Sequence, residues 1–515
     1  MQASTQIADG PVTAQASQLA AEGGRAAESF DVLIVGAGLS GIGAACHLQR
    51  ECPSKTFAIL EAREVIGGTW DLFRYPGVRS DSDMYTLGYR FRPWQQPRAI
   101  VDGPSILKYI RETAREYGID RKVRFGYRVT HASWSSALGL WSIDATAPDG
   151  TTVHFTTKFL FMCSGYYDYD EGHMPGWPGM DRFHGRIVHP QQWPEDLDCK
   201  GKRIVVIGSG ATAVTLAPAL AESAAHVTML QRSPTYIVAR PSKDKIANWL
   251  RPWIGARLAY SFARWKNVLF GIYFYNLARR KPEETKQGIL RLAQKELPPG
   301  YDVSTHLSPH YNPWDQRLCL IPDADLFSAI RLGKVAIVTD DIETFTEKGL
   351  RLKSGAELEA DILVTATGLK LKLLGGMQVC VDGVPANIAR TLSYKGLMYS
   401  DIPNLASTFG YINASWTLKA DLIAEYVCRL LNYMDEQGYD ICAPRRRDSG
   451  IVEEPALNFT SGYIKRASNI LPKQGSRKPW RLRQNYALDL LDLRFGKIDD
   501  GTLEFSSLEK PAHAV

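Results

Sequence analysis

Short apolar runs that end at a glycine organise this chain of 515 residues. The run 32–35 (VLIV) meets Gly36, and the run 204–207 (IVVI) meets Gly208. After each glycine the sequence continues in small and apolar residues, which is typical of the start of a buried helix. A strand, a glycine-rich turn and a helix in this order predict a dinucleotide-binding unit, and the chain contains two of them.

The first unit carries the full GxGxxG pattern at Gly36, Gly38 and Gly41. Glycines at these places allow a tight turn and let a pyrophosphate approach the backbone at the positive end of the helix. A second apolar strand (TFAIL) runs directly into Glu61, where an acidic side chain accepts hydrogen bonds from ribose hydroxyls. The first unit is therefore predicted to hold an adenosine whose ribose hydroxyls are free.

The second unit has the GxGxxA form of the pattern, at Gly208, Gly210 and Ala213. Its second strand ends at Arg232 and Ser233 instead of an acidic residue. A guanidinium and a hydroxyl suit a ribose 2′-phosphate, which a carboxylate would repel. We therefore expect NADPH here. The alternative, that Arg232 only caps a surface strand, is the weaker interpretation in this context.

Two later apolar segments, 159–165 and 361–368, also end at glycine and are predicted to close the two sheets. The expected fold class is α/β, with two Rossmann-like dinucleotide-binding domains, the second inserted into the first. The expected boundaries are a disordered extension at 1–28, a first domain at 29–168 that resumes at 369–515 with a C-terminal tail, and a second domain at 169–368 with a helical insertion at about 241–300.

Composition and charge argue against a nucleic-acid-binding protein and a metal site, but they do not indicate a particular activity. The chain is 45% apolar and 23% charged, and its net charge of +6 is small for this length. No basic cluster is interleaved with aromatic residues, so we expect no nucleic-acid partner. The eight cysteines contain no CxxC pair, and no metal site is expected. This scattered pattern is typical of reduced thiols, so a cytoplasmic location is predicted. Residues 1–28 lack the basic start and apolar run of a signal peptide.

The most apolar helical segment, 267–278, is too short to cross a membrane, which takes about 20 residues. Cations flank it at Lys266, Arg279 and Arg280. We expect a buried helix or the wall of a substrate cavity. A weak association of its aromatic side chains with a membrane surface stays open as an alternative.

Two adjacent dinucleotide sites imply electron transfer between them, and a flavin is the natural occupant of the first. Disulfide reductases carry a redox-active cysteine pair soon after the first ribose-binding acid. The corresponding segment here, 65–83, contains no cysteine and instead holds a glycine pair, aromatic residues and a Tyr-Pro-Gly turn. A dithiol relay is therefore excluded, and the segment is predicted to form a wall of the flavin pocket.

Two motifs in the sequence resemble those of Baeyer–Villiger monooxygenases, which are class B flavin monooxygenases. One is FxGxxxHxxxW followed by proline, at 183–194, and the other is GGxWxxxxYPGxxxD, at 67–81. The segments 68–94, 310–322 and 413–422 are similar to the subgroup of the mycobacterial ethionamide-activating FAD-containing monooxygenase. The resemblance runs from about residue 30 to the C-terminus.

The resemblance implies an enzyme that takes electrons from NADPH through FAD and reacts with dioxygen to form a flavin peroxide. A ketone would then become an ester or lactone, and sulfur in thioethers or thioamides would be oxidised. Two alternatives stay open: a flavin monooxygenase that acts mainly on heteroatoms, and, with less support, a redox-sensing NADPH flavoprotein.

The resemblance also implies site residues. Arg317 would hold a permanent positive charge in the catalytic site, oriented by Asp81. In that family His189 belongs to a linker that couples nucleotide binding to domain motion and is not a proton donor. Many relatives have a lysine where this chain has Gln316, so the preference for NADPH would depend mainly on Arg232. The implied cofactor contacts are, for FAD, Gly36, Gly38, Ser40, Gly41, Glu61, Thr69, Trp70, Asp81 and Val129; for NADP, Arg79, Ser80, Gly208, Ser209, Gly210, Ala211, Thr212, Ala213, Arg232 and Ser233; and, for either, Asp71 and Leu72.

Overall fold

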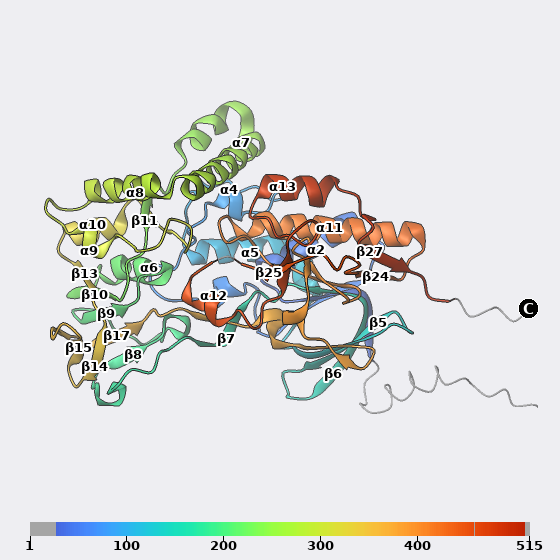
Figure 1. The fold of residues 1–515 in the computed structure, drawn as a ribbon, viewed down its shortest axis with the longest axis horizontal. Helices are drawn as coiled ribbons and strands as arrows, with labels where there is room; N and C mark the ends of the chain where they lie inside the picture. Colours follow the sequence, from blue (N-terminus) through green and yellow to red (C-terminus); the bar gives the residue numbers. More distant parts are fainter. Residues whose placement is uncertain (1–26, 458, 510–515) are drawn as a thin grey trace, which may run out of the picture.

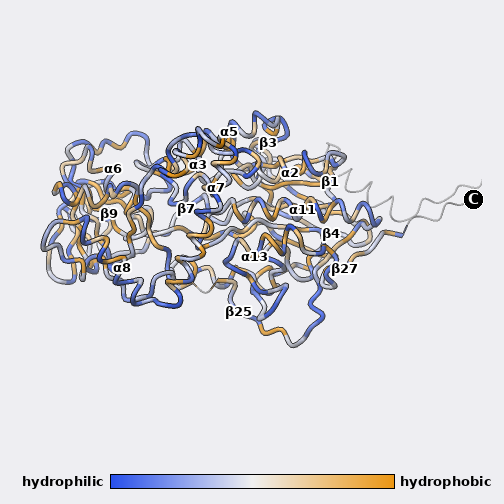
Figure 2. Tube along the Cα trace, turned by 90° about the horizontal axis from the view of Figure 1, so that it is seen from above, coloured by the Kyte–Doolittle hydropathy of each residue, from blue (hydrophilic) through white to orange (hydrophobic). Residues whose placement is uncertain are grey.

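The computed structural model describes residues 27–457 and 459–509, so most of the predicted N-terminal extension lies outside the described residues. Figure 1 shows two α/β bodies side by side, one around β5 and β6 and the other around β9 and β10. Figure 2 shows hydrophobic segments gathered in the interior around β9, with hydrophilic segments on the outer loops. Each body is therefore built on its own sheet and core.

The first body contains a nine-stranded sheet in which β1 (Glu28–Val35) runs parallel to β2 (Phe57–Glu61) and β6 (Thr152–Met162) on either side. Alternate residues of β1 enter different cores: Val32 packs in the core that contains the helices, and Leu33 packs on the opposite side. The other strands are β3 (Val123–Phe125), β4 (Arg128–Ser135), β5 (Leu140–Thr146), β19 (Gln378–Val381), β20 (Val384–Pro385) and β23 (Leu405–Ser407).

The second body contains a five-stranded sheet of order β13-β10-β9-β17-β8, in which all neighbours are parallel. Parallel strands covered on both faces are apolar along their length, and residues 204–206 of β9 are at most 1% exposed. The strands are β8 (Arg186–Val188), β9 (Arg203–Ile207), β10 (His226–Gln231), β13 (Val335–Thr339) and β17 (Ile362–Thr365), with α6 (Ala211–Leu220) and α10 (Asp325–Arg331) beside them.

The order of the strands shows that the second sheet is inserted into the first. The chain builds β1 to β6, leaves to form the second sheet, and returns with β19, which pairs β4, and with β23, which pairs β6. The outgoing connection, β7 (Tyr167–Gly172), pairs antiparallel with the returning one, β18 (Leu369–Leu371). The predicted fold class, with one dinucleotide-binding domain interrupted by another, is confirmed.

The predicted helical insertion consists of α7 (Lys245–Arg280) and α8 (Pro282–Glu296). The expectation that segment 267–278 is buried or lines a cavity is wrong for one of its faces. Leu269, Phe270 and Tyr273 are 56%, 52% and 64% exposed, whereas Val268 is buried. The apolar pattern does not distinguish these faces, because the helix carries apolar residues on all sides.

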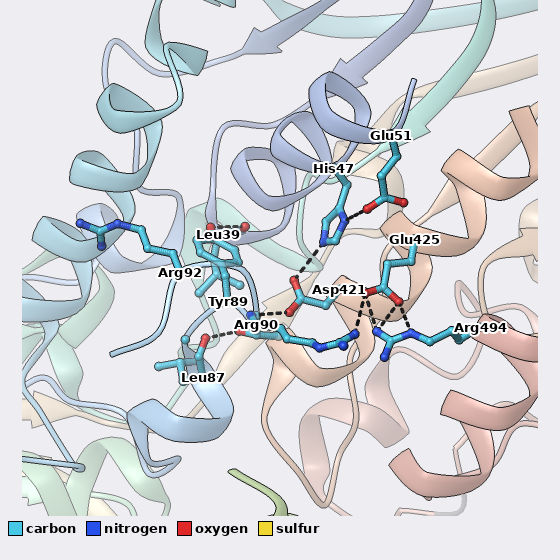
Figure 3. A network of polar contacts seen from close by, with 12 residues as sticks. Leu39, His47, Glu51, Leu87, Tyr89, Arg90, Arg92, Asp421, Glu425 and Arg494 are labelled. Carbon is cyan, nitrogen blue, oxygen red and sulfur yellow. Dashed lines mark hydrogen bonds and ion pairs between the residues drawn. The ribbon is translucent and has the colours of Figure 1, made fainter. Parts of the chain in front are cut away.

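A polar network holds α2 (Leu39–Glu51) against α11 (Trp416–Gln437), as Figure 3 shows. The buried His47 places Nδ1 2.7 Å from Glu51 and Nε2 3.6 Å from Asp421. The second oxygen of Asp421 accepts a hydrogen bond from the Arg90 backbone N–H at 3.0 Å. Burial lowers the pKa of His47, but the nearby carboxylates of Asp421 and Glu51 outweigh it and raise the pKa to about 9.

Within residues 27–457 and 459–509, no helix is both long and apolar enough to cross a membrane. The same residues contain no cluster of three or more His, Cys, Asp or Glu side chains placed to hold a metal ion. All eight cysteines are free thiols, and seven of them are buried.

Candidate active site

A cleft of about 1090 Å³ lies at the carboxyl ends of parallel strands from both sheets. The last residues of β1, β2 and β9 line it, together with the residues that follow β10. This edge is where ligands bind in open α/β sheets, because the glycine turns and helix N-termini open there. The predicted FAD and NADPH sites therefore share one cleft.

The first glycine loop leaves no room for larger residues. Gly36 has φ +103°, and a Cβ there would lie 2.6 Å from the carbonyl oxygen of Cys163. A Cβ at Gly41 would lie 1.8 Å from the carbonyl oxygen of Gly36. The loop thus holds the backbone of α2 close to β1, and Gly38 and Ser40 line the cleft at the start of this helix.

Glu61 closes this loop from the end of β2. Its carboxylate is buried and accepts hydrogen bonds from the backbone N–H of Ala37, at 2.7 Å, and of Arg63, at 2.9 Å. Burial raises the pKa of Glu61, and the two N–H donors oppose that rise. The side chain is thus held in one orientation and contributes to the cleft wall.

The second glycine loop has the same construction. Gly208 has φ +141°, and a Cβ there would lie 2.3 Å from the carbonyl oxygen of Ala366, whereas a Cβ at Gly210 would meet nothing within 4 Å. Arg232 and Ser233 lie at the cleft beyond β10. Arg232 is exposed and forms no ion pair with any described residue, so its charge is available to an anion.

Arg317 and Asp81 meet in the cleft although 236 residues separate them. The Nη2 and Nε atoms of Arg317 lie 3.2 Å from the two carboxylate oxygens of Asp81. The negative charge of Asp81 raises the pKa of Arg317 above its already high ordinary value, against the effect of burial. The Arg317 side chain is 36% exposed and lines the cleft.

A group of tyrosines that the sequence reasoning missed surrounds this arginine. The hydroxyls of Tyr166 and Tyr167 are 2.9 Å apart, and both rings line the cleft together with Tyr463. Burial is the largest cause that raises the pKa of Tyr166, Tyr167 and Tyr463, so these phenols stay neutral beside Arg317. The signal that could have located two of them is the run YYDY directly after Gly165.

Aromatic side chains contact two of the residues predicted to bind FAD, Ser40 and Thr69. Tyr166 stacks on Trp416, with ring centroids 5.0 Å apart. The indole N–H of Trp416 donates to the hydroxyl of Ser40 at 2.8 Å. On the other side, the hydroxyls of Tyr169 and Thr69 are 3.0 Å apart. Ser40 and Thr69 therefore lie in the cleft wall as expected from the sequence, each with an aromatic partner.

The structure does not bring every predicted contact residue into the cleft. Asp71 is buried in ion pairs with Arg63, at 2.6 Å, and Arg111, at 2.7 Å. Arg79 lines the cleft but is engaged by Asp325 at the start of α10. Four predicted cofactor contacts do not line the cleft: Gly41, Asp71, Leu72 and Ala213. Besides the residues described above, the predicted contacts that line it are Trp70, Ser80, Val129, Ser209, Ala211 and Thr212.

His189 lies outside the cleft, at the crossing of the two connections between the sheets. Its ring packs against Gly172 of β7, where a Cβ would lie 1.9 Å from the imidazole. Its Nε2 is 3.3 Å from the carbonyl oxygen of Gly368, just before β18. Burial lowers the pKa of His189, so the ring is neutral at physiological pH. The position is suited to a hinge contact.

Comparisons with known proteins agree with this architecture. The model of the flavin-binding monooxygenase-like family matches residues 93–253, and that of an NAD(P)-binding Rossmann-like domain matches residues 34–96. Solved structures of a steroid monooxygenase bound to NADP and of cyclohexanone monooxygenase bound to ε-caprolactone each have a TM-score of 0.72. Each is 20% identical, covers 93% of this chain and is itself covered completely, which shows a shared fold.

Relatives of higher identity extend over nearly the whole chain. The FAD-containing monooxygenase EthA of Mycobacterium tuberculosis is 58% identical over 485 residues, which are 94% of this chain and 99% of EthA. The putative FAD-containing monooxygenase MymA of the same species is 49% identical, covering 93% of this chain and 98% of MymA. The probable FAD-binding monooxygenase AlmA of Acinetobacter baylyi is 47% identical, covering 92% and 96%. This chain belongs to the family of FAD-containing monooxygenases.

Proposed function

We propose that this protein is an NADPH-dependent Baeyer–Villiger monooxygenase that also oxidises sulfur. In the proposed reaction a ketone, dioxygen, NADPH and a proton give an ester or lactone, NADP⁺ and water. A thioether or thioamide would instead receive the oxygen atom at sulfur. The observation that carries the proposal is the paired Arg317 and Asp81 in a cleft that both glycine loops open into.

The residues of the cleft fit the two cofactors that this reaction needs. The Gly36 loop leaves a backbone cradle at the N-terminus of α2, and Glu61 presents a fixed carboxylate for ribose hydroxyls. At the other side, the Gly210 turn is open, and the exposed Arg232, which no described residue pairs with, offers a cation for a 2′-phosphate. When bound, FAD would supply the two-electron chemistry that joins NADPH to dioxygen.

Arg317 supplies the positive charge for the negative charge that develops during oxygen transfer. A guanidinium cannot lose its proton at working pH, whereas an ammonium or imidazolium in the same place could. Asp81 holds both its Nε and Nη2, so the orientation of the charge is set before substrate arrives. The neutral phenols of Tyr166 and Tyr167 add no competing negative charge.

We further propose residues 169–368 as the NADPH-binding domain and the two flanking parts as the FAD-binding domain. Both boundaries fall at the pair β7 and β18, where the register aligns Gly172 with Leu369. His189 touches both connections. Rotation of one domain against the other would therefore change the contacts of His189, which supports the linker role implied for the motif at 183–194.

The test is to follow NADPH consumption, hydrogen peroxide and organic products together, over a panel of ketones, thioethers and thioamides. We expect ester or lactone and sulfoxide to form in proportion to NADPH consumed. Sulfur or nitrogen products without any ester from the ketones would favour the heteroatom alternative. NADPH oxidation that gives only hydrogen peroxide, with every substrate, would overturn the monooxygenase proposal and favour a redox-sensing flavoprotein.

A further inference from the structure

One face of α7 turns away from the protein and carries an unusual density of apolar side chains. Ten of the twenty large apolar residues that are exposed in the described part of the chain lie on this helix of 36 residues. All three tryptophans that are exposed among the described residues are included. We call this surface the α7 face; it consists of Ile246, Trp249, Trp253, Ile254, Leu258, Phe262, Trp265, Leu269, Phe270 and Tyr273.

The opposite side of α7 is attached to the protein. Ala259 and Ala263 are at most 1% exposed, and the hydroxyl of Tyr260 donates to the carbonyl oxygen of Gly88 at 3.1 Å. The buried Arg264 donates to the carbonyl oxygen of Tyr85 at 2.9 Å. A helix anchored along one side normally turns polar residues to solvent, and an apolar outer face of this extent indicates a partner.

The shape of α7 makes the face accessible. Gly255, with φ +79°, interrupts the helix, and the two arms form an arch that projects from the body in Figure 1. Trp253, beside this interruption, is 76% exposed. The ring of Trp265 lies 5.8 Å from that of Tyr486 in α13 (Tyr486–Leu490), and this neighbouring segment adds the exposed residues Leu488, Leu491 and Phe495.

The charge of α7 points to the kind of partner. The helix contains seven cationic residues and no Asp or Glu. Lys266 and Arg279 are neutralised by Asp244 and Asp315, and Arg264 lies 3.6 Å from Asp421. Among the described residues, the exposed Lys245, Arg257 and Arg280 form no ion pair. An apolar face with unpaired cations at its margin is complementary to an anionic lipid surface.

We propose that the α7 face docks on the surface of an anionic membrane. The tryptophans and aliphatic side chains would enter the interfacial region, and Lys245, Arg257 and Arg280 would contact lipid phosphates. The arch would lie in the plane of the membrane, since no described helix qualifies to cross it. A second copy of the chain is a less suitable partner, because a two-fold contact would bring the same unpaired cations together without any acid on α7 to compensate them.

Vesicle flotation with the full-length, FAD-loaded protein tests the proposal. We expect binding to vesicles of phosphatidylcholine mixed with phosphatidylglycerol, and binding that weakens with salt. The double substitution Trp249→Ser and Trp253→Ser should weaken partitioning at least about tenfold, because two large apolar groups are lost from the buried face. Arg257→Glu with Arg280→Glu should weaken binding to the anionic vesicles and leave the weaker binding to pure phosphatidylcholine unchanged.

Val384→Ser is the matched control, because this residue is 67% exposed and lies on β20 at the edge of the first sheet, outside α7. It should bind vesicles like the unchanged protein. All variants should retain NADPH oxidation, which shows that they fold. The proposal is overturned if the protein does not bind anionic vesicles, or if the tryptophan variant binds as well as the unchanged protein. Light scattering that shows a dimer lost in the tryptophan variant would assign the face to a second copy instead.

Discussion

Arg317 and Asp81 form a two-point ion pair, with both N–O distances at 3.2 Å, across the junction between the two domains. Asp81 precedes α4 (Met84–Leu87) in the first body. Arg317 precedes β12 (Cys319–Pro322), which follows β10 and precedes β13 of the second body along the chain. The contact therefore depends on the relative position of the two bodies. The charge at the reacting site and the arrangement of the domains are coupled through this pair.

We predict that Arg317→Ala binds FAD but does not oxygenate ketones. The Gly36 loop and Glu61 do not depend on this side chain, so the protein should stay yellow. Without a permanent countercharge, reducing equivalents should appear as hydrogen peroxide, and ester formation should fall by roughly a hundredfold or more. The yield of ester per NADPH is the measurement. An unchanged yield in Arg317→Ala would remove this residue from the mechanism.

Asp81→Ala should impair the same step less severely. The carboxylate orients the guanidinium but does not supply the positive charge, so a loss of about tenfold is expected. Asp81→Asn is the matched control, because an amide retains the shape and one acceptor. Its ester yield should lie between those of the unchanged protein and Asp81→Ala. The idea of an orienting role fails if Asp81→Ala loses as much activity as Arg317→Ala.

Arg232→Ala should reduce the preference for NADPH over NADH. A charge-assisted contact to phosphate contributes about 1.5–3 kcal/mol, which corresponds to a change of roughly tenfold to a hundredfold in relative kcat/KM. The change should come from poorer use of NADPH, with NADH nearly unaffected. Gln316→Lys, which adds a second cation next to Arg317, should shift the preference the other way. If Arg232→Ala keeps the original preference, the 2′-phosphate is held elsewhere.

Sequence patterns located the candidate site residues that lie close together along the chain. The two glycine turns, Glu61 and Arg232 each lie within one strand–turn–helix unit, and the structure places them at the expected edge of each sheet. The partner of Asp81 lies 236 residues away, so only the resemblance to a family located it. For Asp71 the sequence was misleading. It was predicted as a cofactor contact, but it forms buried ion pairs with Arg63 and Arg111, which no local sequence pattern indicates.

The outward face of α7 could not be predicted either. The sequence pattern of an apolar helix is the same whether a core, a cavity or an external partner covers its apolar face. The pattern shows only which positions are apolar. The exposed state of Leu269 and Tyr273 becomes visible only when the rest of the fold leaves that side uncovered. The tyrosines around Arg317 were missed for a related reason: Tyr166 and Tyr167 lie where β7 begins, and Tyr463 comes from the C-terminal part of the chain.

We predict that purified protein contains one non-covalent FAD per chain and that Gly36→Ala loses it. A Cβ at this position would lie 2.6 Å from the carbonyl oxygen of Cys163, in a backbone conformation that alanine rarely adopts. The absorbance ratio of flavin to protein after gel filtration is the measurement. Gly210→Ala is the matched control, because its Cβ would meet nothing within 4 Å, and it should retain FAD.

The last prediction concerns the pH dependence of stability, through His47. Its pKa in the folded protein is about 9, compared with an ordinary value of 6.5, because Asp421 and Glu51 outweigh the cost of burial. A raised pKa means that the charged form stabilises the fold below pH 6.5, and that this contribution declines as the pH rises through 9. A shift of this size corresponds to roughly 3 kcal/mol, as an order of magnitude.

The melting temperature of the FAD-loaded protein should therefore fall between pH 6.5 and pH 9. His47→Gln should be less stable than the unchanged protein at pH 6.5, and its melting temperature should vary less across this range. Glu51→Gln should give an intermediate profile, since it removes one of the two carboxylates and leaves Asp421 in place. If His47→Gln falls as steeply as the unchanged protein, other groups are responsible for the dependence and the histidine is not held in its charged form.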